Sequence, residues 1–186
     1  YNQSVSANNA AWEELHKNGN AVDAVVKGVM MSENDWGNCC VGLGGNPDRD
    51  GRVTLDASIM NHKSECGSVA FLEQIKNPIL VARKVMENSP HVMLVGAGAQ
   101  QFAIENGFEL QGLELSDHAK DAFTKWKKKS EYKPIINIEK GPNPPMRFDN
   151  GEWNHDTIGM IAMDAQGNLS GACTTSGMGF KMRGRV

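Results

Sequence analysis

The stretch HDTIGMIAMDAQGNLSGACTT, residues 155–175, decides the fold of this chain. Two apolar runs that suit β-strands, residues 157–163 and 168–175, flank a short polar segment. That segment begins with Asp164 and ends with Gly167, residue types favoured at the first and last positions of a type I turn. The pattern therefore predicts an antiparallel hairpin.

The predicted hairpin gathers threonines around one peptide bond. A turn centred between residues 165 and 166 pairs Thr157 with Thr174, and Thr175 with Asp156. A threonine hydroxyl is a weak nucleophile and needs a base to take its proton. Cleavage of the Asp156–Thr157 bond would supply one, because a freed α-amine titrates close enough to neutral pH to act as a general base. Thr157 would then carry both the nucleophile and the base.

Three cationic side chains follow the hairpin within a few residues: Lys181, Arg183 and Arg185. Arginine matches a carboxylate with its planar fork of donors. We therefore expect these side chains to receive an anionic substrate.

The composition indicates one globular domain or part of one, with 186 residues, 40% hydrophobic, 22% charged and a formal net charge of −3. The basic run Lys-Trp-Lys-Lys-Lys at residues 125–129, with Ser116 as N-cap, favours the solvated end of a helix over a nucleic-acid site. No signal peptide or membrane span is recognisable in the sequence. We expect neither nucleic acid nor a membrane as a partner.

The cysteines do not have the spacing of a metal site. Cys39, Cys40, Cys66 and Cys173 contain no C-x-x-C pair, so we expect no metal and no other cofactor. Buried thiols are favoured, although four cysteines allow three disulfide pairings that the sequence leaves open. A lone His155 is more typical of a structural residue than of a metal ligand. The glycine run at residues 42–45 lacks the ending of a phosphate-binding loop and favours a tight turn.

The rest of the chain has a mixed α/β pattern. Ser6 is expected to cap a helix that reaches residue 17, and the apolar positions from 21 to 30 predict a second helix. Strands are expected at residues 53–60 and 91–95, with a helix between them that begins at Asn77-Pro78. A further helix is expected at residues 98–106, and the proline cluster near 141–145 predicts an exposed loop over residues 131–154.

Several motifs together carry a family resemblance. They are HDTIGM at residues 155–160, TTSG at 174–177 and GRV at 184–186, with upstream blocks at 41–48, 51–60 and 83–96. With these motifs the chain resembles the glycosylasparaginase family of the N-terminal nucleophile hydrolases over nearly its whole length. The combination is specific, whereas any single block would be weak.

The resemblance implies a four-layer αββα sandwich, incomplete in this chain, and a precursor that cleaves itself. Residues 1–156 would form an α-subunit-like segment, and residues 157–186 the start of the β-subunit with the nucleophile hairpin. The implied reaction is hydrolysis of the amide that joins N-acetylglucosamine to asparagine during glycoprotein degradation.

The resemblance also implies roles for individual residues. Thr157 is the nucleophile, and Asp156 and His155 take part in autoproteolysis. Thr175 supports the Thr157 hydroxyl, and Arg185 binds the substrate carboxylate. Cys40 occupies the position of a serine that orients the freed amine in relatives, and a thiol is the weaker hydrogen-bonding group.

Two departures affect these expectations. The family continues after Gly-Arg-Val with a Gly-Asp-Ser-Pro stretch and a later Thr-Gly oxyanion segment, which this sequence does not contain. The family's first strand is also missing before Tyr1. We therefore expect a precursor fragment, truncated at both ends and inactive alone.

Two alternatives stay open. One is the isoaspartyl peptidase and L-asparaginase branch, which normally has glycine rather than His-Asp before its threonine; the other is a catalytically inert fragment. The expected partner is a small glycosylated asparagine, and the complete protein is expected to be a homo-oligomer of processed α/β units. The expected location is periplasmic or secreted in a bacterium and lysosomal in an animal.

Overall fold

The computed structural model describes residues 2–129 and 157–186, with side chains from residue 4 onward. The helices of this part are α1 (Asn2–His16), α2 (Ala21–Glu33), α3 (Pro78–Asn88), α4 (Gly96–Glu105) and α5 (Asp117–Lys129). The strands are β1 (Leu55–Met60), β2 (Cys66–Leu72), β3 (Met93–Val95), β4 (Ile158–Met163) and β5 (Leu169–Thr175). The chain is therefore of the mixed α/β class, as the sequence predicted.

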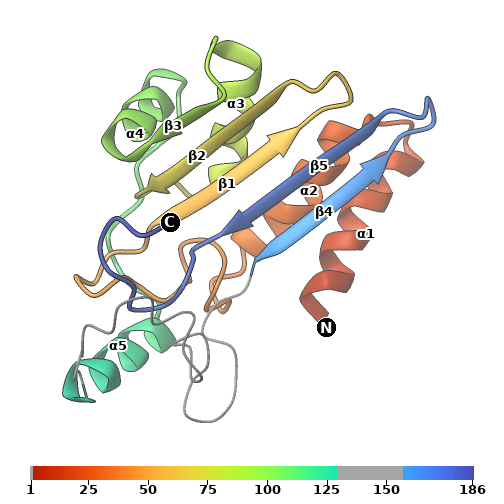
Figure 1. Cartoon of the computed structure of the whole chain (residues 1–186). Coiled ribbons are helices and arrows are strands. Elements are labelled where there is room, and N and C mark those ends of the chain that lie inside the picture. The colour runs from red at the N-terminus through yellow and green to blue at the C-terminus, as the bar shows by residue number, and fades with distance from the viewer. Residues whose placement is uncertain (1, 130–156) are drawn as a thin grey trace, which may run out of the picture.

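The five described strands form one sheet in the order β3-β2-β1-β5-β4. Strands β2 and β3 are parallel, and the other neighbours in this sheet are antiparallel. Strand β5 lies between β1 and β4, so a strand from the end of the chain is inserted beside one from its first half (Figure 1). The predicted hairpin is thus built into the sheet beside β1.

Helices cover one face of the sheet. Helix α2 packs on β4 and β5, α3 packs on β1 and β2, and α1 packs on α2 (Figure 1). More and less buried side chains alternate along β4 and β5, as in a sheet covered on one face, whereas the first three residues of β1 are all buried. The core contains Val25, Val29, Leu55, Ala57, Ile59, Val69, Leu72, Ile79, Val85 and Ala172.

The opposite face of the sheet is apolar and carries no helix in the described part of the chain (Figure 1). Its exposed side chains include Met60, Met93, Ile161, Met163 and Leu169, and Ile161 is 75% exposed. Large apolar surfaces of this kind are typical of faces that pack against another element. The described residues supply one helical layer and one sheet of the predicted sandwich.

The hairpin is confirmed, but its predicted register is wrong by one residue. Ile158, rather than Thr157, pairs with Thr174. The loop contains one more residue than predicted, because Asp164 pairs with Asn168 and Gly167 adopts a left-handed φ of 80° after the turn. A type I turn followed by a left-handed glycine is a common three-residue hairpin loop.

The corrected register changes which threonines face each other. Thr157 and Thr175 occupy the next facing positions beyond Ile158 and Thr174. Thr174 lies two residues after the core residue Ala172 in β5, so its side chain points to the helices and is buried. Asp156, the predicted partner of Thr175, lies outside the described residues.

Other predicted elements agree with the structure in part. Helix α1 begins before Ser6, so the predicted cap lies inside the helix. Helix α2 begins as expected, and the Asn20 side chain accepts a hydrogen bond from the N–H of Asp23 at its start. Strand β2 was not predicted at all. Its sequence, CGSVAFL, has small residues on both faces and lacks a clear polar alternation.

Helices α3 and α5 begin where predicted, whereas α4 begins at Gly96, two residues before the predicted start. Pro78 is the first residue of α3, and Ser116 caps α5 by accepting a hydrogen bond from the N–H of Ala119 at 3.3 Å. Asn77 does not cap α3 with its side chain, which donates instead to Glu33 and Asn34. No helix within residues 2–129 and 157–186 is long and apolar enough to cross a membrane.

Candidate active site

Thr157 lies just before strand β4, with its side chain exposed at the edge of a cavity. The cavity has a volume of about 350 Å³. Helices α1 and α2, the loop after α2 and the first residues of β4 form its wall. The lining residues are Ser4, Ser32, Gly37, Asn38, Cys39, Cys40, Val41, Thr157, Ile158 and Gly159.

The loop after α2 is held in shape by one buried amide side chain. The Oδ1 atom of Asn38 accepts hydrogen bonds from the N–H groups of Cys40 (2.9 Å) and Val41 (3.1 Å). Gly42 then turns the chain with a φ of 74°, where a Cβ would lie 2.4 Å from the carbonyl oxygen of Glu33. The glycine run therefore forms a tight turn, as predicted.

Thr175 is joined to this loop at the end of β5. Its hydroxyl donates to the carbonyl oxygen of Cys40 at 3.4 Å and accepts from the N–H of Gly177 at 2.9 Å. The Cys40 carbonyl also accepts from the N–H of Ser176 at 2.8 Å. Thr157, Cys40 and Thr175, three predicted site residues, thus share one end of the sheet.

Lys181 is buried rather than available to a substrate. Its side chain is 1% exposed, and Nζ donates to the carbonyl oxygen of Ser176 at 2.9 Å. Nζ also lies 4.0 Å from Oδ2 of Asp56, whose Oδ1 accepts from the N–H of Phe71. Burial lowers the pKa of Lys181, while the charge of Asp56 opposes this shift. The prediction that Lys181 receives substrate is wrong; the residue holds its own loop in place.

Arg183 is likewise engaged by internal carboxylates. Its guanidinium donates to Glu73 at 2.8 Å and to Asp48 at 3.3 Å, and it lies 5.0 Å from the ring centre of Phe71. The hydrogen bond to Glu73 is the main reason why the pKa of Arg183 is raised. Arg185 is half-buried at the end of this loop, and its Nη1 donates to the carbonyl oxygen of Val186 at 3.3 Å.

Glu33 was not anticipated from the sequence. It ends helix α2 with 3% exposure and accepts hydrogen bonds from the hydroxyl of Thr174 (2.8 Å), the N–H of Ile79 (3.1 Å) and the amide of Asn77 (3.0 Å). Burial raises its pKa to about 7, although these hydrogen bonds act in the opposite direction. The sequence did contain an indication that Glu33 is buried, because it lies four residues after Val29 on the apolar face of α2.

Nearly the whole chain is similar to proteins of one family. Residues 2–186 match the asparaginase family. This chain belongs to the asparaginase family. It is 56% identical over 186 residues to the N(4)-(β-N-acetylglucosaminyl)-L-asparaginase of Elizabethkingia miricola, covering all of this chain and 50% of that protein.

Mammalian relatives are also similar. Over 200 residues, identity is 35% to the rat protein of the same name and 34% to the mouse protein, in each case covering 97% of this chain and 57% of the relative. The chain thus spans about half the length of the curated relatives it matches. The resemblance inferred from its motifs is confirmed.

Two predicted residues of this asparaginase-family chain, His155 and Asp156, lie outside the described residues. Within the described ranges, no group of three His, Cys, Asp or Glu side chains is placed to hold a metal ion. The predicted site residues that the structure describes are therefore Thr157, Thr175, Cys40 and Arg185.

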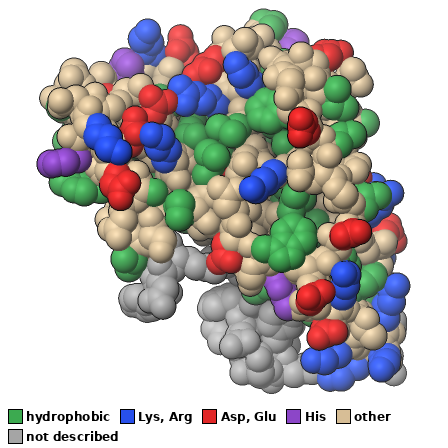
Figure 2. Space-filling model, turned by 180° about the vertical axis from the view of Figure 1, so that it is seen from behind, with side chains coloured by type: hydrophobic (Ala, Val, Ile, Leu, Met, Phe, Trp, Pro, Cys, Tyr) green, Lys and Arg blue, Asp and Glu red, His purple; other side chains and the backbone are tan. Residues whose placement is uncertain are grey.

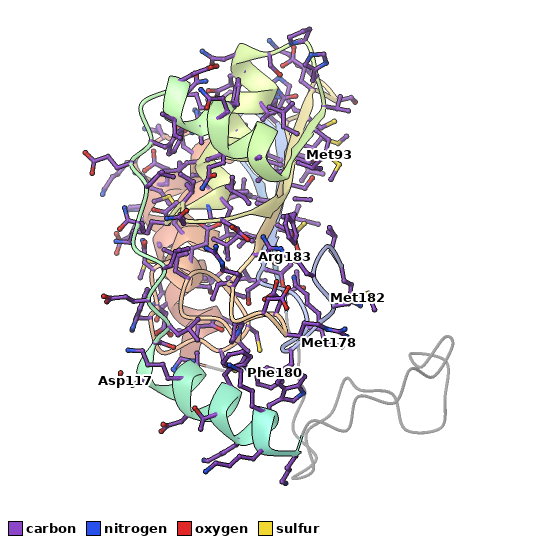
Figure 3. All side chains as sticks on the ribbon, turned by 90° about the vertical axis from the view of Figure 1, so that its left-hand side faces the viewer. Met93, Asp117, Met178, Phe180, Met182 and Arg183 are labelled. Carbon is purple, nitrogen blue, oxygen red and sulfur yellow. The ribbon has the colours of Figure 1, made fainter. Side chains whose placement is uncertain are left out.

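Helix α5 supports the loop that carries Arg185. Phe180 stacks on Trp126 with ring centres 5.2 Å apart, and Trp126 stacks on Phe123 at 5.9 Å. Figure 3 shows Phe180 beside α5 and Arg183 further along the same loop. The basic run ends α5 as predicted, and acidic and basic side chains are interspersed over this part of the surface (Figure 2).

Proposed function

We propose that this chain supplies the nucleophile and the carboxylate-binding arginine of an amidohydrolase that cleaves the bond between N-acetylglucosamine and asparagine. Thr157 becomes the N-terminal nucleophile after autoproteolysis between Asp156 and Thr157, assisted by His155. This divides the chain into an α-subunit of residues 1–156 and a β-subunit that begins at residue 157. One observation carries the proposal: Thr157 lies on the wall of a cavity, and its position in the hairpin is opposite that of Thr175.

The position of Thr157 suits both roles of an N-terminal nucleophile. Its side chain is exposed to the cavity, while Ile158, the next residue, is fixed in the sheet ladder. A freed amine at residue 157 would therefore remain beside its own hydroxyl, on a rigid strand. The relatives from Elizabethkingia, rat and mouse are named for this amidase activity, which supports the choice of reaction.

The reaction then proceeds in two stages. The Thr157 hydroxyl attacks the side-chain carbonyl of the substrate, and its proton passes through the Thr157 amine to the leaving glycosylamine. The resulting ester is hydrolysed by water, which releases aspartate and restores the hydroxyl. Thr175, held by the Cys40 carbonyl and the Gly177 N–H, positions the nucleophile.

Arg185 binds the α-carboxylate of the substrate in this scheme. Its planar fork suits two parallel hydrogen bonds to a carboxylate. Among its neighbours, Lys181 is buried and Arg183 binds Asp48 and Glu73. Cys40 takes the position of the serine that orients the nucleophile's amine in relatives.

The bare face of the sheet fits the proposed four-layer fold. The relatives are about twice as long as this chain, and the exposed face is apolar around Ile161, Met163 and Leu169. A second sheet packed there would complete the sandwich. The complete protein would be a homo-oligomer of processed units, exported in a bacterium or lysosomal in an animal.

A second candidate is hydrolysis of asparagine or of β-aspartyl peptides, which the name of the matched family favours. Both reactions open an amide on an aspartyl side chain, so Thr157 and Arg185 would keep their roles. The two candidates differ in the leaving group, which is a glycosylamine in one case and ammonia or a peptide amine in the other.

The mass of the purified full chain after incubation tests the proposal. Cleavage should give two products that separate at Asp156–Thr157, and Thr157→Ala should abolish it. Thr124→Ala, which changes an exposed threonine of α5, is the matched control. A chain that stays intact under all conditions would favour the inert alternative.

Substrate preference then decides between the two enzyme branches. The complete protein is incubated with N-acetylglucosaminyl-asparagine, with asparagine and with a β-aspartyl dipeptide, and released aspartate is measured. Faster release from the sugar conjugate supports the proposed reaction. Faster release from the dipeptide would assign the protein to the peptidase branch.

A further inference from the structure

Two adjacent thiols line the cavity beside Thr157. The Sγ atoms of Cys39 and Cys40 are 3.3 Å apart, and neither residue is in a disulfide. Cys40 is 6% exposed and Cys39 is half-buried, and both contribute to the cavity wall. The proposed reaction assigns no role to Cys39 and none to the pair.

The backbone around the pair is fixed on both sides. The carbonyl oxygen of Cys39 accepts from the N–H of Asn46 at 2.8 Å, and that of Cys40 accepts from the N–H of Ser176 at 2.8 Å. The Cys40 N–H donates to Asn38. The two thiols are therefore held next to each other by the fold and need little ordering when they bind a common ligand.

Local geometry disfavours a disulfide between these two residues. The peptide bond between them is trans, which fixes their Cα atoms about 3.8 Å apart. Disulfides usually need a Cα separation of at least about 4.4 Å. A bridging atom relaxes this requirement: two sulfurs bound tetrahedrally at about 2.3 Å from one ion are about 3.8 Å apart. A pyramidal atom with a lone pair has a narrower angle between its two sulfurs, which brings them closer together than this value, as in the observed separation of 3.3 Å.

We propose that Cys39 and Cys40 form a dithiol site for a soft, thiophilic metalloid, with trivalent arsenic as the matching class. Soft ligands of this kind prefer thiolates. Among the described residues no third His, Cys, Asp or Glu completes a metal-binding group, so this part of the chain offers such a ligand two sulfurs. An organic arsenical with one carbon substituent meets this condition, and it would occupy the cavity that Thr157 lines.

The binding reaction is balanced without an oxidant or reductant. Phenylarsine oxide carries one arsenic–oxygen group and one phenyl group. The two S–H bonds break, two As–S bonds form, and the oxygen leaves with both protons as water. Arsenic stays trivalent, and the phenyl group stays attached.

The test uses the reduced full chain and phenylarsine oxide at equal concentration. Intact mass is measured after a challenge with excess glutathione, a monothiol, and again after dithiothreitol, a dithiol. We expect one arsenical to survive glutathione and to be released by dithiothreitol. Peptide mapping of the retained adduct should locate it on the segment that contains residues 39 and 40. No adduct surviving glutathione, or one mapped elsewhere, would overturn the proposal.

Matched variants separate this pair from the other thiols. Cys39→Ser and Cys40→Ser should each reduce the glutathione-resistant fraction at least tenfold, with circular dichroism as the check on folding. The double variant Cys66→Ser with Cys173→Ser should keep it, because those residues lie on strands β2 and β5. Retention in Cys39→Ser, or its loss in the double variant, would contradict the site. The adduct mass can be measured on the uncut chain or on its 1–156 product, so the readout is independent of whether Thr157 is catalytic.

Discussion

The hydroxyl of Thr174 in strand β5 donates a 2.8 Å hydrogen bond to the carboxylate of Glu33, the last residue of helix α2. The same carboxylate accepts a hydrogen bond from the N–H of Ile79, near the start of α3. One buried acid therefore ties two helices to the strand that carries Thr175.

The first prediction concerns the effect of pH on stability through Glu33. Burial raises its pKa from 4.5 to about 7, so the folded chain binds more protons than the unfolded chain between these values. The contribution of Glu33 is therefore fully present below pH 4.5 and is lost as the pH rises through 7, by up to roughly 3 kcal/mol. Urea unfolding near pH 5 and near pH 8 measures the difference.

Glu33→Gln isolates this effect because glutamine does not titrate. The variant should lose most of the stability change that Glu33 contributes between the two pH values. Glu114→Gln, which changes an exposed glutamate, should leave that change intact. An unaltered pH profile in Glu33→Gln would show that Glu33 does not titrate in this window.

The second prediction concerns the buried pair of Lys181 and Asp56. Lys181→Met should destabilise the chain by about 3 to 5 kcal/mol, because it leaves the Asp56 carboxylate buried without its cation. Adding Asp56→Asn should recover part of the loss, and urea unfolding of the two single variants and the double variant gives the coupling. Lys63→Met, at an exposed lysine, is the control. Additive losses would mean that the two charges do not interact.

The third prediction concerns the turn that shapes the cavity wall. Gly42→Ala places a methyl group 2.4 Å from the Glu33 carbonyl oxygen at a φ of 74°. Gly107→Ala has a φ of 84° but open space, and should cost only the backbone strain, about 1 kcal/mol. We expect Gly42→Ala to cost clearly more, as measured by the free energy of unfolding.

Gly98→Ala, inside α4 with no close neighbour, should instead stabilise the chain by about 0.5 to 1 kcal/mol.

The fourth prediction separates the two neighbouring threonines. Thr175→Val removes the hydroxyl that binds the Cys40 carbonyl and the Gly177 N–H. It should raise the barrier to self-cleavage by about 1 to 3 kcal/mol, which slows the reaction roughly 5-fold to 150-fold. Thr174→Val, on the other face of β5, should lower stability through Glu33 with a smaller effect on the rate. Time courses of intact mass measure the rate. Equal slowing by both variants would argue that Thr175 acts only through the fold.

The sequence was sufficient to predict the hairpin but not its register. Alternating apolar runs and the Asp164 to Gly167 turn indicated two antiparallel strands, and both are present. The register depended on one backbone angle, the left-handed φ of Gly167, which adds a residue to the loop. A turn motif predicts that the chain reverses direction more reliably than it predicts the number of residues in the loop.

Long-range burial was the main feature that local patterns could not predict. Lys181 looked like a substrate cation because it follows the hairpin closely, yet Asp56, 125 positions earlier, holds it inside the fold. Strand β2 was missed because its pairing with β1 and β3, rather than its composition, makes it a strand. The positions of Thr157, Thr175 and Cys40 were predicted together because a family motif records such long-range contacts.

Strand β5 is hydrogen-bonded along both of its edges, to β1 on one side and to β4 on the other. Residues 158–175 therefore form a segment that is bound to the first half of the chain through strand pairing. A break in the backbone before Thr157 would remove a covalent link but none of these ladders. The sheet would continue to hold the two polypeptides as one folding unit, with a new chain end placed at the cavity.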